Sequence, residues 1–333
     1  MPDDPQTDVV TGAFGYSGAV IARELFAAGH RVRTLTGHPR RAPEGTPIDV
    51  RQMDFADPGA LRRDLQGVHT LYNTYWIRFP RGGTTHETAV AHSRILIDAA
   101  AQAGVRRVVH VSITHADDAA ASRYSYFRGK AAVEAHLQSV GLPHAIVRPS
   151  VLFGGDGVLL NNIAWLLRHL PVFAIGGDGS YRLRPIHVDD LARLMVELGG
   201  RSGSVTVDAV GPESLRFREM VMAIRAATGS RAVIVAAPAQ AIPPLSRVLG
   251  LALRDTLLTS DEYRAMAAGL ADSGAPATGK VKLTDWIAEH GDDLGRSYAN
   301  EITRHYRLGA AAGARRPRTA GTMVACQIGS SRS

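Results

Sequence analysis

A glycine-rich turn near the N-terminus constrains the fold of this chain more than any other feature. Residues 9–18 read Val-Val-Thr-Gly-Ala-Phe-Gly-Tyr-Ser-Gly, so Gly12, Gly15 and Gly18 follow a short apolar segment at three-residue intervals. An amphipathic stretch as far as Ala28 comes next, which predicts a strand, a turn and a helix. Glycine permits close approach of the backbone to a phosphate, and a helix N-terminus offers it free N–H groups. The turn predicts dinucleotide binding, and a tight turn without a ligand is the alternative.

The first 150 residues alternate apolar segments with amphipathic ones. We expect strands at Val9–Thr11, Arg31–Leu35, Asp49–Met53, Val68–Tyr72, Val105–Val111 and His144–Val147. We expect helices at Tyr16–Ala28, Pro58–Leu65, Thr85–Ala103 and Tyr124–Val140. Strands separated by helices form a parallel sheet with helices on both faces. The predicted fold class is α/β, a Rossmann-type doubly wound parallel sheet that binds its ligand at the carboxyl ends of the strands.

After Pro149 the alternation loosens, and glycine-rich turns occur at 154–157 and 176–179. The expected helices are Asp189–Leu198, Leu215–Thr228, Leu245–Leu258, Ser260–Gly269 and Leu283–Tyr306. We therefore expect a dinucleotide-binding domain over 1–150 and a smaller C-terminal substrate lobe over 151–308 that partly returns to the core. Residues 309–333 are small, polar and glycine-rich, and we interpret them as a disordered tail.

The charge of the chain is concentrated near its end. The formal net charge is +7, but the last 25 residues hold Arg315, Arg316, Arg318 and Arg332 and no acidic residue. A solvated tail is the interpretation, and a phosphate or membrane-surface contact is the alternative. This pattern does not favour nucleic-acid binding.

Cysteine usage and hydropathy narrow the class further. Cys326 is the single cysteine, which excludes an internal disulfide framework and a multi-cysteine zinc site, and we expect no metal. No run approaches the about 18 apolar residues that span a bilayer, and the N-terminus has no signal-peptide pattern. A cytoplasmic location is the expectation.

The residues after the second expected strand bear on the choice of dinucleotide. An NAD site usually has an acidic residue about 20 positions beyond the glycines, where it binds the ribose. This chain has His38, Arg40 and Arg41 there instead. A 2′-phosphate suits such side chains, so the sequence favours NADP, with NAD as the alternative. The other interpretation is that Arg40 and Arg41 are solvated loop residues.

Other residues are expected along the cofactor. Asp54 and Phe55 follow the third strand and could border the adenine, although a turn at Asp54 fits equally well. Asn73 ends the fourth strand and is placed to line the groove. Phe14 and Tyr16 lie within the glycine turn itself.

Tyr126 and Lys130 are the candidates for chemistry. They stand four residues apart, which places them on one face of a helix. A neighbouring ammonium favours the phenolate and so would lower the tyrosine pKa from about 10 toward a value useful for proton transfer. Lys130 could also bind the nicotinamide ribose. Ser112 and Thr114 follow the fifth strand, where a hydroxyl could polarise a carbonyl.

Several motifs occur in an order that resembles a known family. They are the glycine turn, Val-Ser-Ile-Thr at 111–114, Tyr126-x-x-x-Lys130, Arg-Pro-Ser-Val-Leu-Phe-Gly at 148–154 and Pro-Ile-His-Val-Asp-Asp-Leu-Ala at 185–192. Over about residues 8–200 the chain resembles the extended and atypical short-chain dehydrogenases/reductases, in the NAD(P)-dependent epimerase/dehydratase group. Within it, the chain is similar to NmrA-like proteins and to the nucleotide-binding accessory subunit of respiratory complex I.

The resemblance implies roles by position. Tyr126 would be the general acid/base, with Lys130 as its partner. Pro149 and the backbone near Val151 would abut the nicotinamide. The pyrophosphate would be held by Gly12, Gly15 and Gly18. Thr114 would supply the catalytic hydroxyl, and Ser112 would be the first serine after the fifth strand. The segment 187–190 is interpreted as mainly structural, and a metal site from His187 and Asp189 is the alternative.

Two apolar features have open interpretations. Tyr72, Tyr75, Trp76 and Phe79 could form a wall near the nicotinamide or could be ordinary packing. The segment 243–254, apolar with two arginines, is interpreted as buried in the lobe. Contact with a membrane surface or with an apolar substrate is the alternative for this segment.

The sequence thus predicts an NAD(P)-dependent oxidoreductase or epimerase that moves a hydride to or from a small-molecule substrate. The first alternative is a non-catalytic NADPH-binding sensor or assembly subunit, because the resemblance extends to such proteins. The second is a binding module that uses the basic tail. Substrate identity and oligomeric state stay open at this point.

Overall fold

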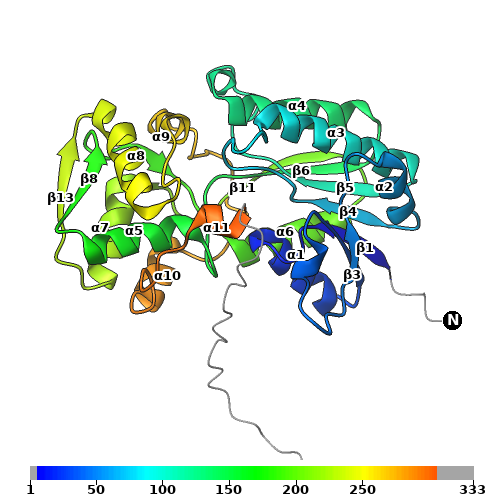
Figure 1. Cartoon of the computed structure of the whole chain (residues 1–333), viewed down its shortest axis with the longest axis horizontal. Coiled ribbons are helices and arrows are strands. Elements are labelled where there is room, and N and C mark those ends of the chain that lie inside the picture. The colour runs from blue at the N-terminus through cyan, green and yellow to red at the C-terminus, as the bar shows by residue number, and fades with distance from the viewer. Residues whose placement is uncertain (1–5, 306–333) are drawn as a thin grey trace, which may run out of the picture.

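A seven-stranded parallel sheet forms the larger part of the computed structural model, which describes residues 6–305 (Figure 1). The predicted tail, 309–333, lies outside these residues. The strand order is β11-β6-β5-β4-β1-β2-β3, so the chain winds outward in both directions from β1, as predicted. The strands are β1 Thr7–Thr11, β2 Arg31–Thr36, β3 Asp49–Gln52, β4 Thr70–Asn73, β5 Arg107–Val111, β6 His144–Pro149 and β11 Val205–Ala209.

Helices cover both faces of this sheet. One face carries α1 (Tyr16–Ala27) and α6 (Val188–Gly199). The other carries α2 (Pro58–Asp64), α3 (His86–Gln102) and α4 (Ser125–Ser139). Because successive strand residues point to opposite faces, the neighbours Val9 and Val10 of β1 belong to two different core clusters. The sheet is therefore buried on both sides, which explains its nearly continuous apolar strands.

A second body, which we call the lobe, lies beside the carboxyl ends of the strands (Figure 1). Its core joins α5, α7 and α10, and β8 pairs with β13 in a two-stranded parallel sheet. The lobe elements are α5 Val158–His169, β8 Val172–Gly176, α7 Phe217–Ala227, β13 Val233–Ala237, α8 Ile242–Leu253, α9 Ser260–Ala267, α10 Leu283–His290 and α11 Glu301–His305. Short elements complete the chain: β7 Leu152–Phe153 with β10 Ile186–His187, β9 Arg182–Leu183 with β12 Leu215–Arg216, and the 3-10 turns η1 Pro39–Arg41, η2 Ala121–Arg123 and η3 Ala239–Ala241.

The strands and helices predicted for the first 150 residues are confirmed, with slightly shifted bounds. The continuous helix predicted at Leu283–Tyr306 is wrong. The helix ends at His290, because Gly291 packs directly on the carbonyl of Ala227 and Gly295 has a φ of +73°. The predicted helix Leu245–Leu258 also ends early, at Leu253, because Arg254 takes a left-handed conformation with φ 52°.

Several elements of the second half were not predicted. They are α5 and the strands β8, β11 and β13. The strand β11 adds to the edge of the main sheet beside β6, and α6 packs against α1, so this half contributes to the sheet layer as well as to the lobe. Among residues 6–305, no helix combines the length and the apolar character needed to cross a bilayer. The cytoplasmic location stays a prediction.

Candidate functional site

The glycine turn begins where β1 ends. Gly12 has a φ of +63°, which glycine adopts without strain. Its N–H donates to the carbonyl of Leu35 over 2.9 Å, and the N–H of Ala13 donates to the Oγ1 of Thr34 over 3.0 Å. Both bonds tie the turn to β2. The turn is therefore held rigidly at the centre of the sheet, where the strand order reverses.

Gly18 lets helix α1 lie directly against this turn. A Cβ at Gly18 would stand 2.8 Å from the carbonyl carbon of Gly12, closer still to its oxygen, and 3.2 Å from the carbonyl oxygen of Thr11. These are backbone atoms that cannot rotate away. A Cβ at Gly15 would meet only the Gly12 oxygen, at 3.2 Å. The turn and the helix thus form a cradle that any side chain at Gly18 would fill.

The N-terminus of α1 fits an anionic ligand. Its N-cap is Gly15, which offers no side chain to cap the helix, and the first turn holds no acidic residue. Its backbone N–H groups and the helix dipole are therefore open to a negative charge. Phe14 is half-buried in the turn. Tyr16 donates its hydroxyl to the carbonyl of Gly154 over 2.9 Å, which ties the start of α1 to the loop after β7.

The predicted ribose end of the site carries basic residues and no acid. The 3-10 turn η1 follows β2, and it exposes Arg40 and Arg41. His38 is half-buried, and its N–H donates to the Oγ1 of Thr36 over 3.1 Å. These positions suit a phosphate, and they do not by themselves decide between NADP and NAD.

The two residues predicted beside the adenine behave differently. Asp54 is exposed, and its Oδ1 accepts the N–H of Ala56 over 2.9 Å, which is the turn geometry that the sequence left open. Phe55 stacks on His92 with ring centroids 4.0 Å apart and lies 5.0 Å from the ring of Tyr75. Phe55 therefore packs against α3.

Asn73 is fully buried and its amide is engaged by the protein. Its Oδ1 accepts the N–H of Tyr75 over 3.0 Å, and its Nδ2 lies 3.1 Å from the Nδ1 of His110. The side chain thus links β4 to β5. Asn73 thus has a structural role, and its place along the cofactor groove stays a prediction.

The two candidate hydroxyls after β5 are also distinguished. Thr114 donates its Oγ1 to the carbonyl of Leu270 over 3.0 Å, so the lobe occupies the hydroxyl that the resemblance made catalytic. The Oγ of Ser112 is buried and has no hydrogen-bond partner among residues 6–305. A buried hydroxyl without a partner indicates a missing ligand or water. Ser112 is thus the better candidate for contact with a bound group.

The residues predicted beside the nicotinamide lie at the end of β6. Pro149 is buried, and its carbonyl accepts the N–H of Thr114 over 3.1 Å. The carbonyl of Val151 accepts the N–H of Ile186 over 2.9 Å. Both carbonyls are thus used to join β5, β6 and β10.

Tyr126 stands in an aromatic cluster at the start of α4. Its ring meets the rings of Trp76, His86 and Phe127 edge-on, with centroids 5.6 to 5.9 Å apart. None of the residues from 6 to 305 has a hydrogen bond to its hydroxyl. Burial raises the pKa of Tyr126, the carboxylate of Glu262 adds to the rise, and Arg78 opposes it. The lowered tyrosine pKa expected from the sequence is therefore wrong for the protein without a ligand.

Lys130 shares the helix face with Tyr126 but is directed elsewhere. It is only 2% exposed, and its Nζ donates to the carbonyl of Val111 over 2.7 Å. The ammonium lies 4.5 Å from the ring centroid of Trp76. Gly129 makes this approach possible, because a Cβ there would stand 2.9 Å from the same ring. Burial lowers the pKa of Lys130 to about 7, and Glu134 opposes that change.

The lysine makes a pH dependence measurable. Between pH 7 and the ordinary lysine pKa of 10.5, the unfolded chain binds a proton that folded Lys130 lacks. The free energy of unfolding therefore rises with pH across this window. We expect the free energy of unfolding of the wild type, measured in urea, to rise relative to that of Lys130→Met by about 2–4 kcal/mol from pH 6 to pH 10. Lys282→Met, at an exposed position, should leave the profile unchanged, and a constant difference for Lys130→Met would contradict the burial of the ammonium.

The aromatic residues for which a wall near the nicotinamide and ordinary packing were both open do not form one cluster. Tyr72 belongs to the core on the α1 face, where its hydroxyl contacts Gly199. Tyr75 joins Phe55 and His92, and only Trp76 reaches Tyr126. Sequence reasoning missed His86, which stacks on Trp76 and is 2.9 Å from the Oγ of Ser125 through its Nδ1.

The lobe contacts this aromatic cluster and the loop after β4 through α9. The Nε of Arg78, in the loop after β4, donates to the Oε1 of Glu262 over 2.7 Å, and its Nη2 donates to the carbonyl of Leu257 over 2.8 Å. Ala265 and Leu270 pack with Phe127 in one buried cluster. Sequence reasoning missed these contacts, because they join segments far apart in the chain.

The segment around His187 is structural in this fold, as the resemblance implied. The Nδ1 of His187 caps α6 by accepting the N–H of Asp189, and Asp190 accepts the N–H groups of Lys280 and Val281. In the described part of the chain, no group of three or more His, Cys, Asp or Glu side chains is arranged to hold a metal.

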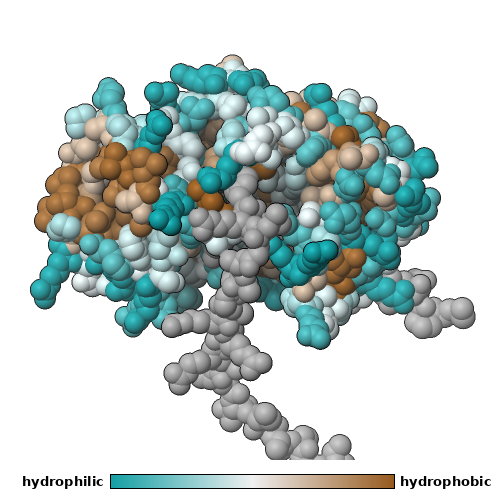
Figure 2. All heavy atoms as spheres, viewed as in Figure 1, coloured by the Kyte–Doolittle hydropathy of each residue, from teal (hydrophilic) through white to brown (hydrophobic). Residues whose placement is uncertain are grey.

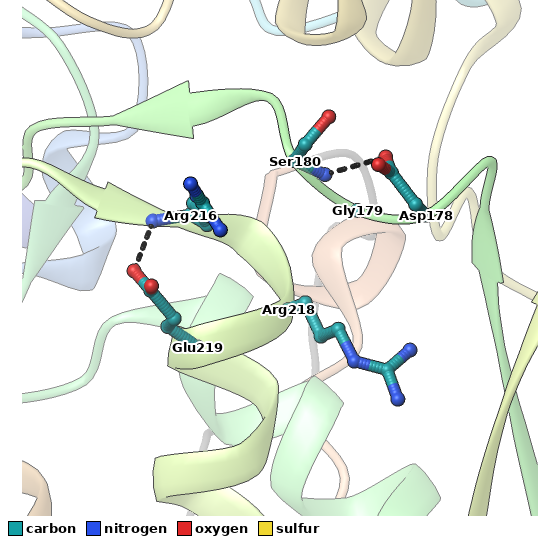
Figure 3. Close-up of a pocket in the computed structure, with 6 residues that line it drawn as sticks. All are labelled: Asp178, Gly179, Ser180, Arg216, Arg218 and Glu219. Atoms are coloured by element: carbon teal, nitrogen blue, oxygen red, sulfur yellow. Dashed lines mark hydrogen bonds between the residues drawn. The ribbon is translucent and has the colours of Figure 1, made fainter.

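Two surface hollows lie away from the glycine turn. The smaller, about 300 Å³, lies at the start of α7 (Figure 3), and its two carboxylates bind neighbouring N–H groups of the protein. The larger, about 550 Å³, opens between η2 and α9 and is bordered by Tyr124 and Tyr263. Neither is lined by Tyr126 or by a residue of the glycine turn.

Fold and cradle together define a dinucleotide-binding protein of the Rossmann class. A family model described as NAD(P)H-binding matches residues 12–198, which is more than half of the chain. The chain belongs to this NAD(P)H-binding family. The finding confirms the resemblance to an NAD(P)-binding family like the extended short-chain dehydrogenases, and the similar proteins include subunits of respiratory complex I as well as reductases.

Three known proteins show the range of similarity. Sterol demethylase protein B of Methylococcus capsulatus is 37% identical over 111 residues, which are 32% of this chain and 34% of that protein. The mitochondrial 40 kDa subunit of NADH-ubiquinone oxidoreductase of Neurospora crassa is 23% identical over 265 residues, 77% of this chain and 69% of the subunit. The crystal structure of Citrobacter sp. triphenylmethane reductase complexed with NADP(H) superposes with a TM-score of 0.70 at 17% identity, covering 86% of this chain and 99% of that one.

These similarities cover only part of some of the known proteins. The chain aligns with only about a third of the length of the Methylococcus protein. At 17% identity, the likeness to the reductase concerns the fold alone.

Proposed function

We propose that this chain is an NADP(H)-dependent oxidoreductase of the short-chain dehydrogenase/reductase type, with Tyr126 as the proton donor. The observation that carries the proposal is the state of Tyr126: three aromatic rings fix its orientation, and its hydroxyl has no hydrogen-bond partner in the described chain. A phenol hydroxyl that is held in place by its ring and is not bound by the protein is available to a substrate atom.

The residues support a reduction. A bound nicotinamide dinucleotide would supply the hydride, and Gly12, Gly15 and Gly18 would hold its pyrophosphate. Because burial raises the pKa of Tyr126, its phenol is protonated at neutral pH and suits donation of a proton to a substrate oxygen. An epimerase would also need the phenolate as a base, which this environment disfavours.

The surroundings of Tyr126 favour a substrate with an aromatic or apolar body and a polar acceptor. Trp76, His86 and Phe127 supply the apolar surface around the phenol. The Nε1 of Trp76 and the Nε2 of His86 are buried without a hydrogen-bond partner within residues 6–305. Such groups could hold a substrate heteroatom, which would remove the cost of leaving them unpaired.

A second candidate is a non-catalytic NADPH-binding sensor or assembly subunit. The observation in its favour is that Trp76 contacts both Tyr126 and Lys130, so the two do not form a direct pair. Similarity to a complex I subunit is in keeping with this reading.

Binding and turnover distinguish these candidates. The purified protein is titrated with NADPH and with NADH, and oxidation of the reduced cofactor is then followed with aldehydes, ketones, quinones, nucleotide sugars and triarylmethane dyes. We expect NADPH binding and turnover of an apolar aromatic substrate. Tight binding with no turnover on the whole panel supports the non-catalytic candidate, and absence of binding overturns both.

The cofactor preference has its own test. Arg40→Ala/Arg41→Ala should weaken NADPH binding by about 10- to 100-fold, because charge-assisted hydrogen bonds to the 2′-phosphate contribute about 1.5–3 kcal/mol. NADH binding should stay constant, and Arg62→Ala, at an exposed position of α2, is the matched control. Equal losses for NADPH and NADH would refute the 2′-phosphate contact.

A further inference from the structure

Helix α8 exposes an apolar stripe, contrary to the burial favoured from the sequence. Leu245, Val248 and Leu251 recur every three residues and so share one face of the helix. Val248 is 64% exposed and Leu251 is 73% exposed. Single exposed apolar side chains are common on protein surfaces, but three in one line on one helix require an explanation.

The stripe continues onto the neighbouring two-stranded sheet. Val172 of β8 and Val233 of β13 are direct partners in the register, and both are exposed together with Val235. Figure 2 shows the hydrophobic residues gathered over α8, β8 and β13 at one end of the molecule. We call this surface the lobe patch, and its residues are Val172, Val233, Val235, Leu245, Val248 and Leu251.

Contacts on the inner face of α8 keep the patch facing outward. Gly250, on the inner face of α8, lies so close to the backbone of Asp255 that a Cβ there would stand 2.6 Å from the Asp255 carbonyl oxygen. Asp255 in turn accepts the hydroxyl of Tyr298 over 2.6 Å and the N–H of Glu301 over 3.0 Å. The helix is thus fixed to the lobe through its inner face, and its apolar face stays in the solvent.

The segment of the chain that carries α8 and β13 has charges of one sign. From residue 220 to residue 254 the chain contains four arginines and no acidic residue. Arg231, Arg247 and Arg254 are exposed, and Arg225 donates its Nε to the carbonyl of Ala232 over 2.7 Å. An apolar surface on a segment whose charged residues are all basic matches the boundary between the headgroups and acyl chains of an anionic bilayer.

We propose that the lobe patch docks on an anionic phospholipid surface. A second copy of the chain is a poorer occupant, because a two-fold contact would bring these arginines against one another. The 12 residues of α8 extend about 18 Å, so the helix would lie in the plane of the surface with Val248 and Leu251 among the acyl chains. This docking is independent of the reaction at Tyr126.

Vesicle flotation with the full chain tests the proposal. The probes are vesicles of phosphatidylcholine alone and of phosphatidylcholine with phosphatidylserine. We expect recovery with the anionic vesicles, little with the neutral ones, and loss of binding as salt is raised. Val248→Asp/Leu251→Asp should reduce the vesicle partition coefficient at least tenfold, and Arg247→Glu should reduce it about fivefold or more.

Matched variants control for charge and folding. Val205→Asp, at an exposed valine of β11, and Arg62→Glu, on α2, make the same changes elsewhere and should bind vesicles like the wild type. Thermal unfolding verifies that each variant is folded. Absence of wild-type binding, or equal binding by Val248→Asp/Leu251→Asp, overturns the proposal and assigns any lipid contact to other residues. A wild-type dimer that this double variant dissociates also overturns it, in favour of a second copy.

Discussion

Gly18→Ala should abolish dinucleotide binding. The new Cβ would press on the carbonyl groups of Gly12 and Thr11, so α1 must move away from the turn. The N–H groups at the start of the helix would then no longer point at the pyrophosphate. Loss of two charge-assisted hydrogen bonds weakens binding by about 100-fold or more, and overpacking lowers the free energy of unfolding by about 1–3 kcal/mol. Fluorescence titration with NADPH and urea unfolding measure the two effects.

Substitutions at two other glycines should have smaller effects and serve as controls for this prediction. Gly15→Ala meets a single backbone oxygen at 3.2 Å and should have an intermediate effect. Gly274→Ala has no atom within 4 Å of the new Cβ and no positive φ, so it should leave both quantities unchanged. If Gly18→Ala binds NADPH like Gly274→Ala, the dinucleotide does not use this cradle.

Tyr126→Phe should remove turnover and spare cofactor binding. Phenylalanine keeps the ring that packs on Trp76 and His86, so the pocket and the stability are retained. Only the hydroxyl is lost, and a general acid contributes about 10²- to 10⁴-fold to the rate. We expect kcat to fall by that factor, with an NADPH dissociation constant within about twofold of the wild type, judged against routine mutational scatter.

Tyr124→Phe is the matched control, because it removes a hydroxyl two residues away at the N-cap of the same helix. It should keep full activity. A second check is the pH profile: since burial raises the pKa of Tyr126, its protonated form persists to alkaline pH and turnover should not decline below about pH 10. An unchanged rate in Tyr126→Phe would exclude the tyrosine as proton donor and direct attention to Ser112.

Local patterns predicted much of the Rossmann layer. The alternation of apolar strands with amphipathic helices has periods of two and about 3.6 residues, which report burial on a nearby sheet whatever lies beyond. The glycine turn was legible for the same reason, because Gly12, Gly15 and Gly18 act within one strand–turn–helix unit. In the second half, the short strands β8 and β13 were missed, because their pairing partners lie far along the chain.

The site shows the same division. The spacing of Tyr126 and Lys130 correctly placed both on one helix, but the partners of each come from elsewhere: Trp76 from the loop after β4, and the carbonyl of Val111 from β5. Thr114 was predicted to be the catalytic hydroxyl, yet the carbonyl of Leu270, 156 residues away, accepts its hydrogen bond. No local pattern could indicate that contact.

By itself, the sequence determined the fold class, the dinucleotide cradle and the candidate tyrosine, because each depends on residues within about one supersecondary unit. Only the tertiary structure decided how deeply the candidate side chains are buried and which atoms they contact. It buried Lys130 and Tyr126 against the same indole, which lowers the pKa of one and raises that of the other. It also turned the apolar stripe of α8 outward. Amphipathic spacing shows that a helix has an apolar face, whereas packing of the whole chain decides whether that face is covered.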